Sequence, residues 1–172
     1  MSRSPVGEIR HTRTTMSFPK PSESNGFLTE HASLLINSFR HWTGRFLVDD
    51  GLPPAQQARE LFYAPFAVAS HDTASDPVLT YGNKTALELW EAPWTDFTSM
   101  PSRRTAETAT QEERNRLLAE VAAHGFIDNY KGVRISAAGR KFFIHEAAVW
   151  NLINEAGTYC GQAAMFRRWK FL

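Results

Sequence analysis

Three polar residues, Arg134, His145 and Gln162, interrupt stretches that otherwise have the apolar composition of buried β-strands. A buried polar group needs a hydrogen-bond partner, which here can be the backbone, another of the three, or a bound small molecule. Tyr81 and Trp150 have aromatic rings that can form the walls of a pocket, since ligand pockets are mostly apolar with a few converging polar groups. These five residues are therefore candidate ligand-binding residues.

A sixth candidate is Arg103, which adjoins Arg104 in a segment, Trp94–Ala109, without clear periodicity. We expect this segment to form short turns and a loop. A guanidinium group can hold a carboxylate or a phosphate through two parallel hydrogen bonds, so Arg103 can clamp an anionic ligand. The alternative is that the two arginines form a solvated basic loop.

Catalytic and metal-binding patterns find little support. His71 and Asp72 can act as a base and its orienting acid, but the end of a strand and the start of a turn explain the pair as well. The single cysteine, Cys160, lies in the middle of a predicted strand, where cysteine is usually a small buried apolar residue. The chain has no His-x-x-x-His, glycine-rich phosphate loop or Gly-x-Ser-x-Gly pattern. We therefore predict no enzymatic activity and no metal site.

The length and the net charge of the chain limit the number of its domains and the kinds of partner that it can attract. A chain of 172 residues is long enough for one domain with extensions, and a net charge of +1 creates no broad field that would attract nucleic acid. One cysteine excludes an internal disulfide and suits a reducing compartment. The sequence has no signal-peptide pattern and no apolar run near the ~20 residues of a membrane span. We expect a cytoplasmic protein without direct contact to nucleic acid or membrane.

The first part of the chain divides into a tail and a helical segment. Residues 1–26 are polar and poor in apolar side chains, which predicts a disordered tail. Phe27–Val48 is a predicted helix, and Ala55–Tyr63 a shorter one that follows a pair of prolines; together they form an N-terminal helical segment, 27–63. The longer helix has one apolar stripe with helical spacing. The stripe consists of Leu28, Leu35, Phe39, Trp42 and Phe46.

A hairpin and further helices follow. The predicted strands Phe66–His71 and Val78–Gly82 are joined by a loop of turn-forming residues. Asn83 is placed to cap the short helix Lys84–Trp90. A longer helix, Thr110–His124, begins with a Thr-x-x-Glu pattern typical of a capping box and ends before a glycine.

The last third of the sequence has three apolar runs separated by short turns, which predict three consecutive antiparallel strands, Phe126–Ile135, Lys141–Ile153 and Thr158–Phe166. The turns between them contain Gly139 and Gly157, where a positive φ is easily adopted. With the hairpin, these strands make an α+β domain built on a five-stranded antiparallel sheet.

Both faces of this sheet are expected to be covered, because the strand Lys141–Asn151 does not alternate apolar and polar residues. The small helices and Thr110–His124 can cover one face. Phe27–Val48, or a second subunit, can cover the other. Simple alternation assigns two sets to opposite faces: Phe143, His145, Ala147 and Val149 on one, and Phe142, Ile144, Glu146, Ala148 and Trp150 on the other.

Several phrases resemble the MEKHLA family, which is related to the PAS domains. They are Leu61-Phe62-Tyr63-Ala64-Pro65-Phe66, Ser70-His71-Asp72, Tyr81-Gly82-Asn83-Lys84-Thr85-Ala86-Leu87 and Gly161-Gln162-Ala163-Ala164. The resemblance implies the PAS sheet order 2-1-5-4-3 for a domain over 64–172, with the N-terminal helix packed outside it. It implies no catalytic residues.

Cofactors of PAS domains are possible but unsupported here. Light-sensing relatives place a flavin-reactive cysteine in an Asn-Cys-Arg phrase, which this chain lacks. Haem-binding relatives use a histidine near the long helix. His124 is the one such residue here, and its position at the helix end favours a capping role.

The resemblance implies a sensory or regulatory module that binds a small molecule between the sheet and its capping helices and signals through a protein partner. The alternative is a ligand-free module that forms a homodimer or binds a regulatory protein.

Overall fold

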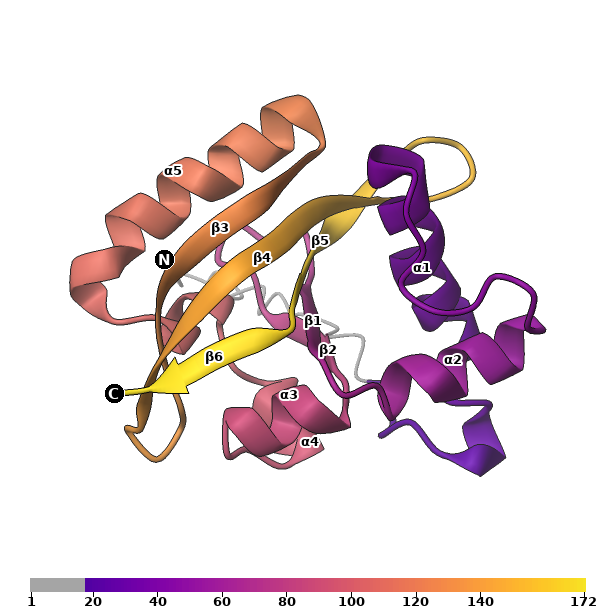
Figure 1. Ribbon diagram of the computed structural model, residues 1–172, viewed down its shortest axis with the longest axis horizontal. Helices are drawn as coiled ribbons and strands as arrows, with labels where there is room; N and C mark the ends of the chain where they lie inside the picture. Colours follow the sequence, from indigo (N-terminus) through magenta and orange to yellow (C-terminus); the bar gives the residue numbers. More distant parts are fainter. Residues whose placement is uncertain (1–17) are drawn as a thin grey trace, which may run out of the picture.

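An antiparallel sheet with the predicted strand order β2-β1-β5-β4-β3 forms the centre of the molecule (Figure 1). The computed structural model describes residues 18–172, apart from the side chains of residues 108–110. The helical elements are η1 (Glu23–Asn25), α1 (Thr29–Thr43), α2 (Pro54–Phe62), α3 (Lys84–Leu89), α4 (Trp94–Phe97), η2 (Ser102–Thr105) and α5 (Thr108–His124). The strands are β1 (Ala67–His71), β2 (Leu79–Gly82), β3 (Phe126–Ile135), β4 (Lys141–Ile153), β5 (Tyr159–Phe166) and β6 (Arg168–Phe171).

The sixth strand, β6, was not predicted. It pairs antiparallel with the first half of β4, from Phe142 to His145, and follows β5 after one intervening residue, Arg167. Its sequence, Arg-Trp-Lys-Phe, was interpreted as part of a basic C-terminal end. The ring of Trp169 packs against that of Phe166, with 5.9 Å between centroids, so an apolar contact holds this strand against the sheet.

Three helical predictions are corrected by the structure. Helix α1 ends at Thr43 rather than at Val48, because Gly44 adopts a positive φ of 70° and donates its backbone N–H to the carbonyl of Arg40. Helix α5 begins two residues before Thr110, so this threonine does not cap it. The segment expected to be irregular, Trp94–Ala109, contains the short helices α4 and η2.

A β-bulge in β4 overturns the predicted assignment of residues to its two faces. Tyr130 pairs with Ala147 and Gly132 with Ile144, so β4 has one more residue than β3 between these pairs. Glu146 has a φ of +48°, which identifies it as the extra residue. Residues of one parity before the bulge therefore share a face with residues of the other parity after it.

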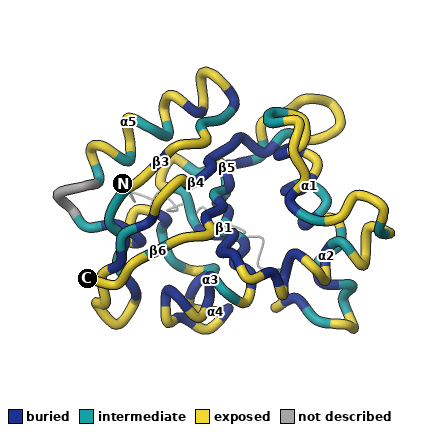
Figure 2. The backbone as a smooth tube through the Cα atoms, in the orientation of Figure 1, coloured by how far each residue is buried: buried dark blue, intermediate teal, exposed yellow. Residues whose placement is uncertain are grey.

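After the bulge, both faces of β4 are buried, as predicted. We call the side toward α3, α4, η2 and α5 the inner face, and the side toward α1 and α2 the outer face. Figure 1 shows α5 and α1 on different sides of β4, and Figure 2 shows its second half as continuously buried. Before the bulge the burial alternates, because α1 does not extend over this part of the strand.

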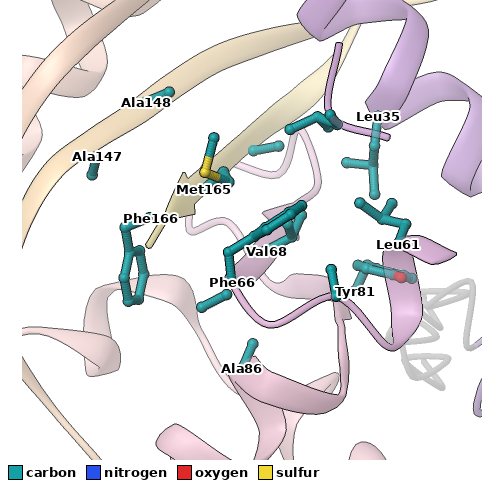
Figure 3. Packing of buried hydrophobic residues seen from close by; sticks show 14 of the residues in the cluster. Leu35, Leu61, Phe66, Val68, Tyr81, Ala86, Ala147, Ala148, Met165 and Phe166 are labelled. Atoms are coloured by element: carbon teal, nitrogen blue, oxygen red, sulfur yellow. The ribbon is translucent and has the colours of Figure 1, made fainter. Parts of the chain in front are cut away.

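Helix α1 covers the outer face, which confirms the predicted position of an N-terminal helix. The ring of Phe39 packs edge-on against Trp150, with 4.9 Å between centroids, and the Trp150 indole Nε1 donates to the carbonyl of Leu35 at 3.3 Å. Ser38 Oγ accepts from the backbone N–H of Ile153 at 3.0 Å. Figure 3 shows Leu35 among the buried residues that α1 and α2 share with the sheet.

Residues 18–26 pack on the domain, although they were included in the predicted tail. The carbonyl of Phe18 accepts from Trp94 Nε1 at 2.8 Å, and η1 lies between Phe18 and α1. The rest of the predicted tail, residues 1–17, lies outside the described residues. Within the described part, no helix combines the length and the apolar character needed to cross a bilayer.

Asn83 caps α3 as predicted, and it also ties the helices to the sheet. Its fully buried side chain accepts at Oδ1 from the backbone N–H groups of Val68 and Ala86, both at 3.0 Å. Its Nδ2 donates to the carbonyls of Leu61 at 3.1 Å and Phe66 at 2.7 Å. One amide thus satisfies backbone groups of α2, β1 and α3 and of the segment before β1.

We predict that Asn83→Ala lowers the free energy of unfolding by at least about 2 kcal/mol, because buried backbone groups lose their partners. Asn154→Ala is the matched control. Asn154 also accepts two backbone N–H groups, from Ala156 and Thr158, but it is exposed, so water can replace its side chain. Urea unfolding measures both variants. Equal small losses would show that the Asn83 network does not connect the helices to the sheet.

A second prediction tests the docking of α1. Phe39→Ala should cost about 3–5 kcal/mol of stability, because Phe39 is 2% exposed and fills the space beside Trp150. Phe46→Ala is the control from the same predicted stripe; Phe46 lies beyond the end of α1 and is 46% exposed, so its loss should cost little. Thermal unfolding measures both variants, and equal effects would contradict this packing.

Candidate functional site

A cavity of about 80 Å³ lies between the inner face of the sheet and the helices that cover it. Its apolar lining includes Leu117 of α5, Phe97 of α4, and Ile144 and Val149 of β4. The bulge at Glu146 allows Ile144 and Val149 to share this face although their positions differ in parity. The shape of the cavity therefore depends on the bulge in β4 as well as on the helices that cover the sheet.

Two arginines line the cavity from opposite layers. Arg134 of β3 is buried; its Nη1 donates to the carbonyl of Val133 at 2.9 Å, and its Nη2 donates to the hydroxyl of Tyr130. Arg114 of α5 donates from Nη2 to Ser102 Oγ at 2.8 Å. Burial lowers the pKa of Arg114 to about 10, and the positive charge of Arg134 contributes to this shift.

His71, at the end of β1, places a buried imidazole at the cavity. Its Nδ1 bonds to the backbone carbonyl of Asp72 at 2.8 Å, so this nitrogen carries a proton. Its Nε2 is buried and has no hydrogen-bond partner among the described residues. Burial is the largest effect and lowers the pKa of His71; the charge of Arg114 also lowers it, whereas the bond to the Asp72 backbone, the charge of Asp72 and the Gln162 side chain raise it. The neutral form, with a lone pair at Nε2, is therefore favoured.

Gly161 permits the close approach of β5 to His71. A Cβ atom at this position would lie 2.1 Å from the carbonyl oxygen of His71, and the φ of Gly161 is +133°, which other residues rarely adopt. The glycine therefore brings Gln162 next to His71 in the sheet, where the two residues form a cross-strand pair.

Gln162 connects the cavity to α5 and β4. Its Nε2 donates to the carbonyl of Leu118 at 3.2 Å and to Asn151 Oδ1 at 3.1 Å. The amide nitrogen of Asn151 donates in turn to the carbonyl of Val121 at 2.9 Å. These bonds fix the orientation of both amides. The Gln162 side chain also lies close enough to His71 to raise the pKa of the imidazole.

Of the six residues predicted to bind a ligand, the structure brings two, Arg134 and Gln162, to the cavity. Tyr81 and Trp150 are buried on the outer face instead: Tyr81 lies 5.7 Å from the ring of His31 in α1, and Trp150 packs against Phe39. Both side chains contact α1, because alternate residues of a strand point to opposite faces and these two point to the outer one.

The other two predicted residues lie at the surface. His145 is exposed on the outer face just before the bulge, with its ring 4.5 Å from that of Phe143. Arg103 is half-exposed in η2 and pairs with Asp76 at 3.1 Å, so its guanidinium is already engaged by a carboxylate. Neither residue lines the cavity.

The sequence analysis did not identify Arg114 and Tyr130, and it gave His71 no role in binding. One signal for Arg114 was available. Arg114, Leu117, Leu118 and Val121 follow the spacing i, i+3, i+4 and i+7, so this arginine lies on the apolar side of α5. A charged residue on such a stripe indicates a buried polar site. No comparable pattern marks Tyr130, whose position depends on irregular pairing between β3 and β4.

The cavity does not fit a flavin or a haem. Its volume of about 80 Å³ is well below the roughly 300–1,000 Å³ of typical cofactor and drug pockets. Cys160 lies outside the cavity lining and donates from Sγ to the carbonyl of Thr158 at 3.2 Å. His124 is exposed at the end of α5. Among the described residues, no cluster of three or more His, Cys, Asp or Glu side chains is arranged to hold a metal.

Solved structures with the same fold are PAS and light-oxygen-voltage domains. A PAS domain from Colwellia psychrerythraea aligns with a TM-score of 0.57 and 14% identity, over 68% of this chain and 94% of that domain. A light-oxygen-voltage domain from work on a flavin analogue aligns with a TM-score of 0.52 and 12% identity, over 68% of this chain and 84% of the other. At these identities the likeness establishes the fold alone.

A third structure, an RNA-binding light-oxygen-voltage receptor, aligns with a TM-score of 0.57 and 18% identity over 69% of this chain. The match spans 34% of the receptor, so this chain corresponds to about a third of that protein. No curated protein matches the chain.

The family comparison covers most of the sequence. The model of the MEKHLA domain matches residues 29–171, from the start of α1 to the end of β6. The match includes α1 and α2, which the sequence analysis placed in a separate segment, 27–63, before the PAS-like domain. By this match, the chain belongs to the MEKHLA domain family.

Proposed function

We propose that this protein is a sensory or regulatory module whose inner cavity binds a small molecule and whose α1 helix changes its packing in response. The observation that carries the proposal is the set of buried polar side chains that converge on the cavity without full hydrogen bonding. His71 Nε2 is the clearest of these, since the residue is 7% exposed and the atom makes no hydrogen bond of normal geometry among the described residues, although the Gln162 side chain lies close to the ring.

An unpaired buried polar atom costs about 1–3 kcal/mol, so a fold retains one at a functional site more readily than elsewhere. Trp90, which also lines the cavity, has a second such atom, its indole Nε1. A bound molecule that pairs with these atoms would recover part of this cost. Binding would then stabilise the form of the domain in which the cavity is closed around it.

A chain of hydrogen bonds offers a route from the cavity to the opposite side of the sheet. Gln162 at the cavity donates to the Asn151 side chain, and the backbone carbonyl of Asn151 accepts from the indole Nε1 of Trp42 in α1 at 2.9 Å. A ligand that moves Gln162 would therefore act on a residue that also holds α1. This is the physical link that coupling between two sites requires.

The contact between Trp42 and the sheet is tight. A Cβ atom at Gly125 would lie 2.4 Å from the Trp42 ring, so the indole packs directly against the backbone between α5 and β3. The backbone N–H of Asn151 donates to the carbonyl of Gly125 at 2.8 Å. A shift of β4 would therefore change the surface against which the Trp42 indole packs. This change would favour a second packing arrangement of α1.

The outer face before the bulge is the surface we propose for a protein partner or a second copy of the chain. Here α1 leaves β4 and β6 uncovered, with His145 exposed and Phe143 half-buried. Phe143 supplies the apolar area of this surface, since Phe171 pairs with Phe142 and lies on the inner face. Basic residues of β6, Arg168 and Lys170, border this area and would favour an acidic partner.

The first test is native mass spectrometry of the purified protein, combined with its absorption spectrum. We expect a fraction of the protein to retain a small added mass, which disappears after unfolding, desalting and refolding. The stripped protein should melt at a lower temperature, since the ligand stabilises only the folded state. A clean mass without added material, from several expression hosts, and a stable dimer would instead support the ligand-free interaction module.

A second test examines the route to α1. Gln162→Met keeps the volume of the side chain and removes its bonds to Leu118 and Asn151. We expect faster amide exchange in the last turn of α1, where Trp42 lies, although Gln162 does not bond to α1. Gln56→Met, at an exposed position of α2, is the control. Unchanged exchange in α1 for both variants would exclude this route.

A further inference from the structure

Two guanidinium groups line one cavity, and the hydrogen bonds among the described residues engage only some of their donors. A guanidinium has five N–H donors. In the bonds described above Arg134 uses two, toward Val133 and Tyr130, and Arg114 uses one, toward Ser102. All three acceptors are neutral, and each arginine retains donors that can face a ligand in the cavity.

No carboxylate of the described residues forms an ion pair with either arginine. The ion pairs among the described residues are formed by other arginines and lysines, whose side chains are about half exposed. Neither Arg114 nor Arg134 takes part in these pairs. Two like charges near each other in a buried space are unfavourable. Burial is the main cause of the lowered pKa of Arg114, and the positive charge of Arg134 adds to it. An anionic ligand in the cavity would pair with both charges.

The other polar groups of the lining can donate as well. Tyr130 accepts from Arg134 and Ser102 accepts from Arg114, so each hydroxyl retains its own proton for a further acceptor. The indole N–H of Trp90 has no partner among the described residues. Protonation of His71 at Nε2 would add another donor, and a nearby negative charge favours it.

The apolar part of the lining restricts which anion fits. Leu117, Phe97 and Val149 bound the space beside the arginines, so a fully hydrophilic ion such as phosphate would leave these surfaces without contact. A cavity of about 80 Å³ admits a ligand of only a few non-hydrogen atoms. A short-chain carboxylate meets both conditions, since its head pairs with guanidinium and its tail contacts the apolar wall.

We propose that the cavity binds a short-chain monocarboxylate, with the carboxylate held between Arg114 and Arg134 and the hydrocarbon tail against α4, α5 and β4. This inference rests on the proposed function, because it specifies the ligand of the same cavity. It differs from that proposal in predicting the charge and the size of the ligand.

Calorimetric titration of stripped protein with sodium propionate and sodium butyrate tests the inference. Propionamide is the matched neutral compound, and sodium phosphate is the matched hydrophilic anion. We expect saturable binding of a carboxylate and at least tenfold weaker binding of both controls. Equal binding of propionamide would show that the arginines do not recognise charge. Equal binding of phosphate would show that the site takes any small anion and would overturn the assignment to carboxylates.

Substitution of the arginines supplies a second test, in which carboxylate binding should weaken while the thermal stability of the stripped protein stays the same or rises. Arg114→Met and Arg134→Met should each weaken carboxylate binding by about ten- to a hundredfold, the effect of losing hydrogen bonds to a charged group. The stripped Arg114→Met protein should melt at the same temperature as the stripped parent protein or higher, since an unpaired charge has been removed. Arg103→Met is the control, because Arg103 is paired with Asp76 at the surface.

Retained carboxylate binding in both variants would contradict the proposed clamp. A large loss of stability in Arg114→Met would also contradict it, because it would show that the guanidinium is a structural group. The test separates the two proposals: a neutral molecule found by native mass spectrometry, with no response to carboxylates, would leave the sensory function standing and remove the anionic ligand. No added mass and no response to any compound would remove both.

Discussion

The second half of β4 is buried on both faces, and most other features of the molecule follow from the need to cover it. On the outer face Trp150 packs against α1, and on the inner face Asn151 bonds to the last turns of α5. A strand with two apolar faces has no stable arrangement in water as part of a bare sheet. The N-terminal helix is therefore a structural part of this domain, in agreement with the family match, which begins at residue 29.

The same strand carries the connection between cavity and surface. Neighbouring residues of a strand point to opposite faces, so a movement that shifts Val149 or Asn151 at the inner side must also move Trp150 at the outer side. Asn151 strengthens this coupling because its side chain bonds to the inner helix while its backbone carbonyl bonds to Trp42 of α1. In the proposed function, a thin sheet packed tightly on both sides would transmit displacement without a long chain of contacts.

The inner cavity departs from the rule that buried polar groups are paired. Asn83 follows the rule, since both atoms of its amide are fully bonded and the residue has a structural role. His71 and Trp90 do not follow it, because each has a buried nitrogen without a partner among the described residues, in the lining that they share with Arg114 and Arg134. Unpaired groups that gather at one space are typical of a functional site; outside the cavity, the Tyr81 hydroxyl is the one further buried side-chain group without a partner among the described residues.

Solved PAS and light-oxygen-voltage domains share the fold of this chain at 12–18% identity, so the architecture tolerates almost complete replacement of its residues. What occupies the space between sheet and helices is then decided by a few side chains. In this chain large aromatic residues fill much of that space: Trp90 packs against Phe97, Phe142 and Phe166. The small remaining cavity is the direct consequence, and its volume of about 80 Å³ is too small for a flavin or a haem.

The sequence by itself determined five of the six strands and the cover of both faces, because periodicity, turn glycines and the cap at Asn83 are local signals; the strand order came from the resemblance to the PAS-related family. Of the residues predicted to bind a ligand, Arg134 and Gln162 line the cavity. Tyr81, His145 and Trp150 do not line it, since one extra residue at Glu146 or a single step along a strand turns a side chain to the other face. Only the tertiary structure decided that Arg114 of α5 meets Arg134 of β3, because their proximity depends on how the helix lies across the sheet.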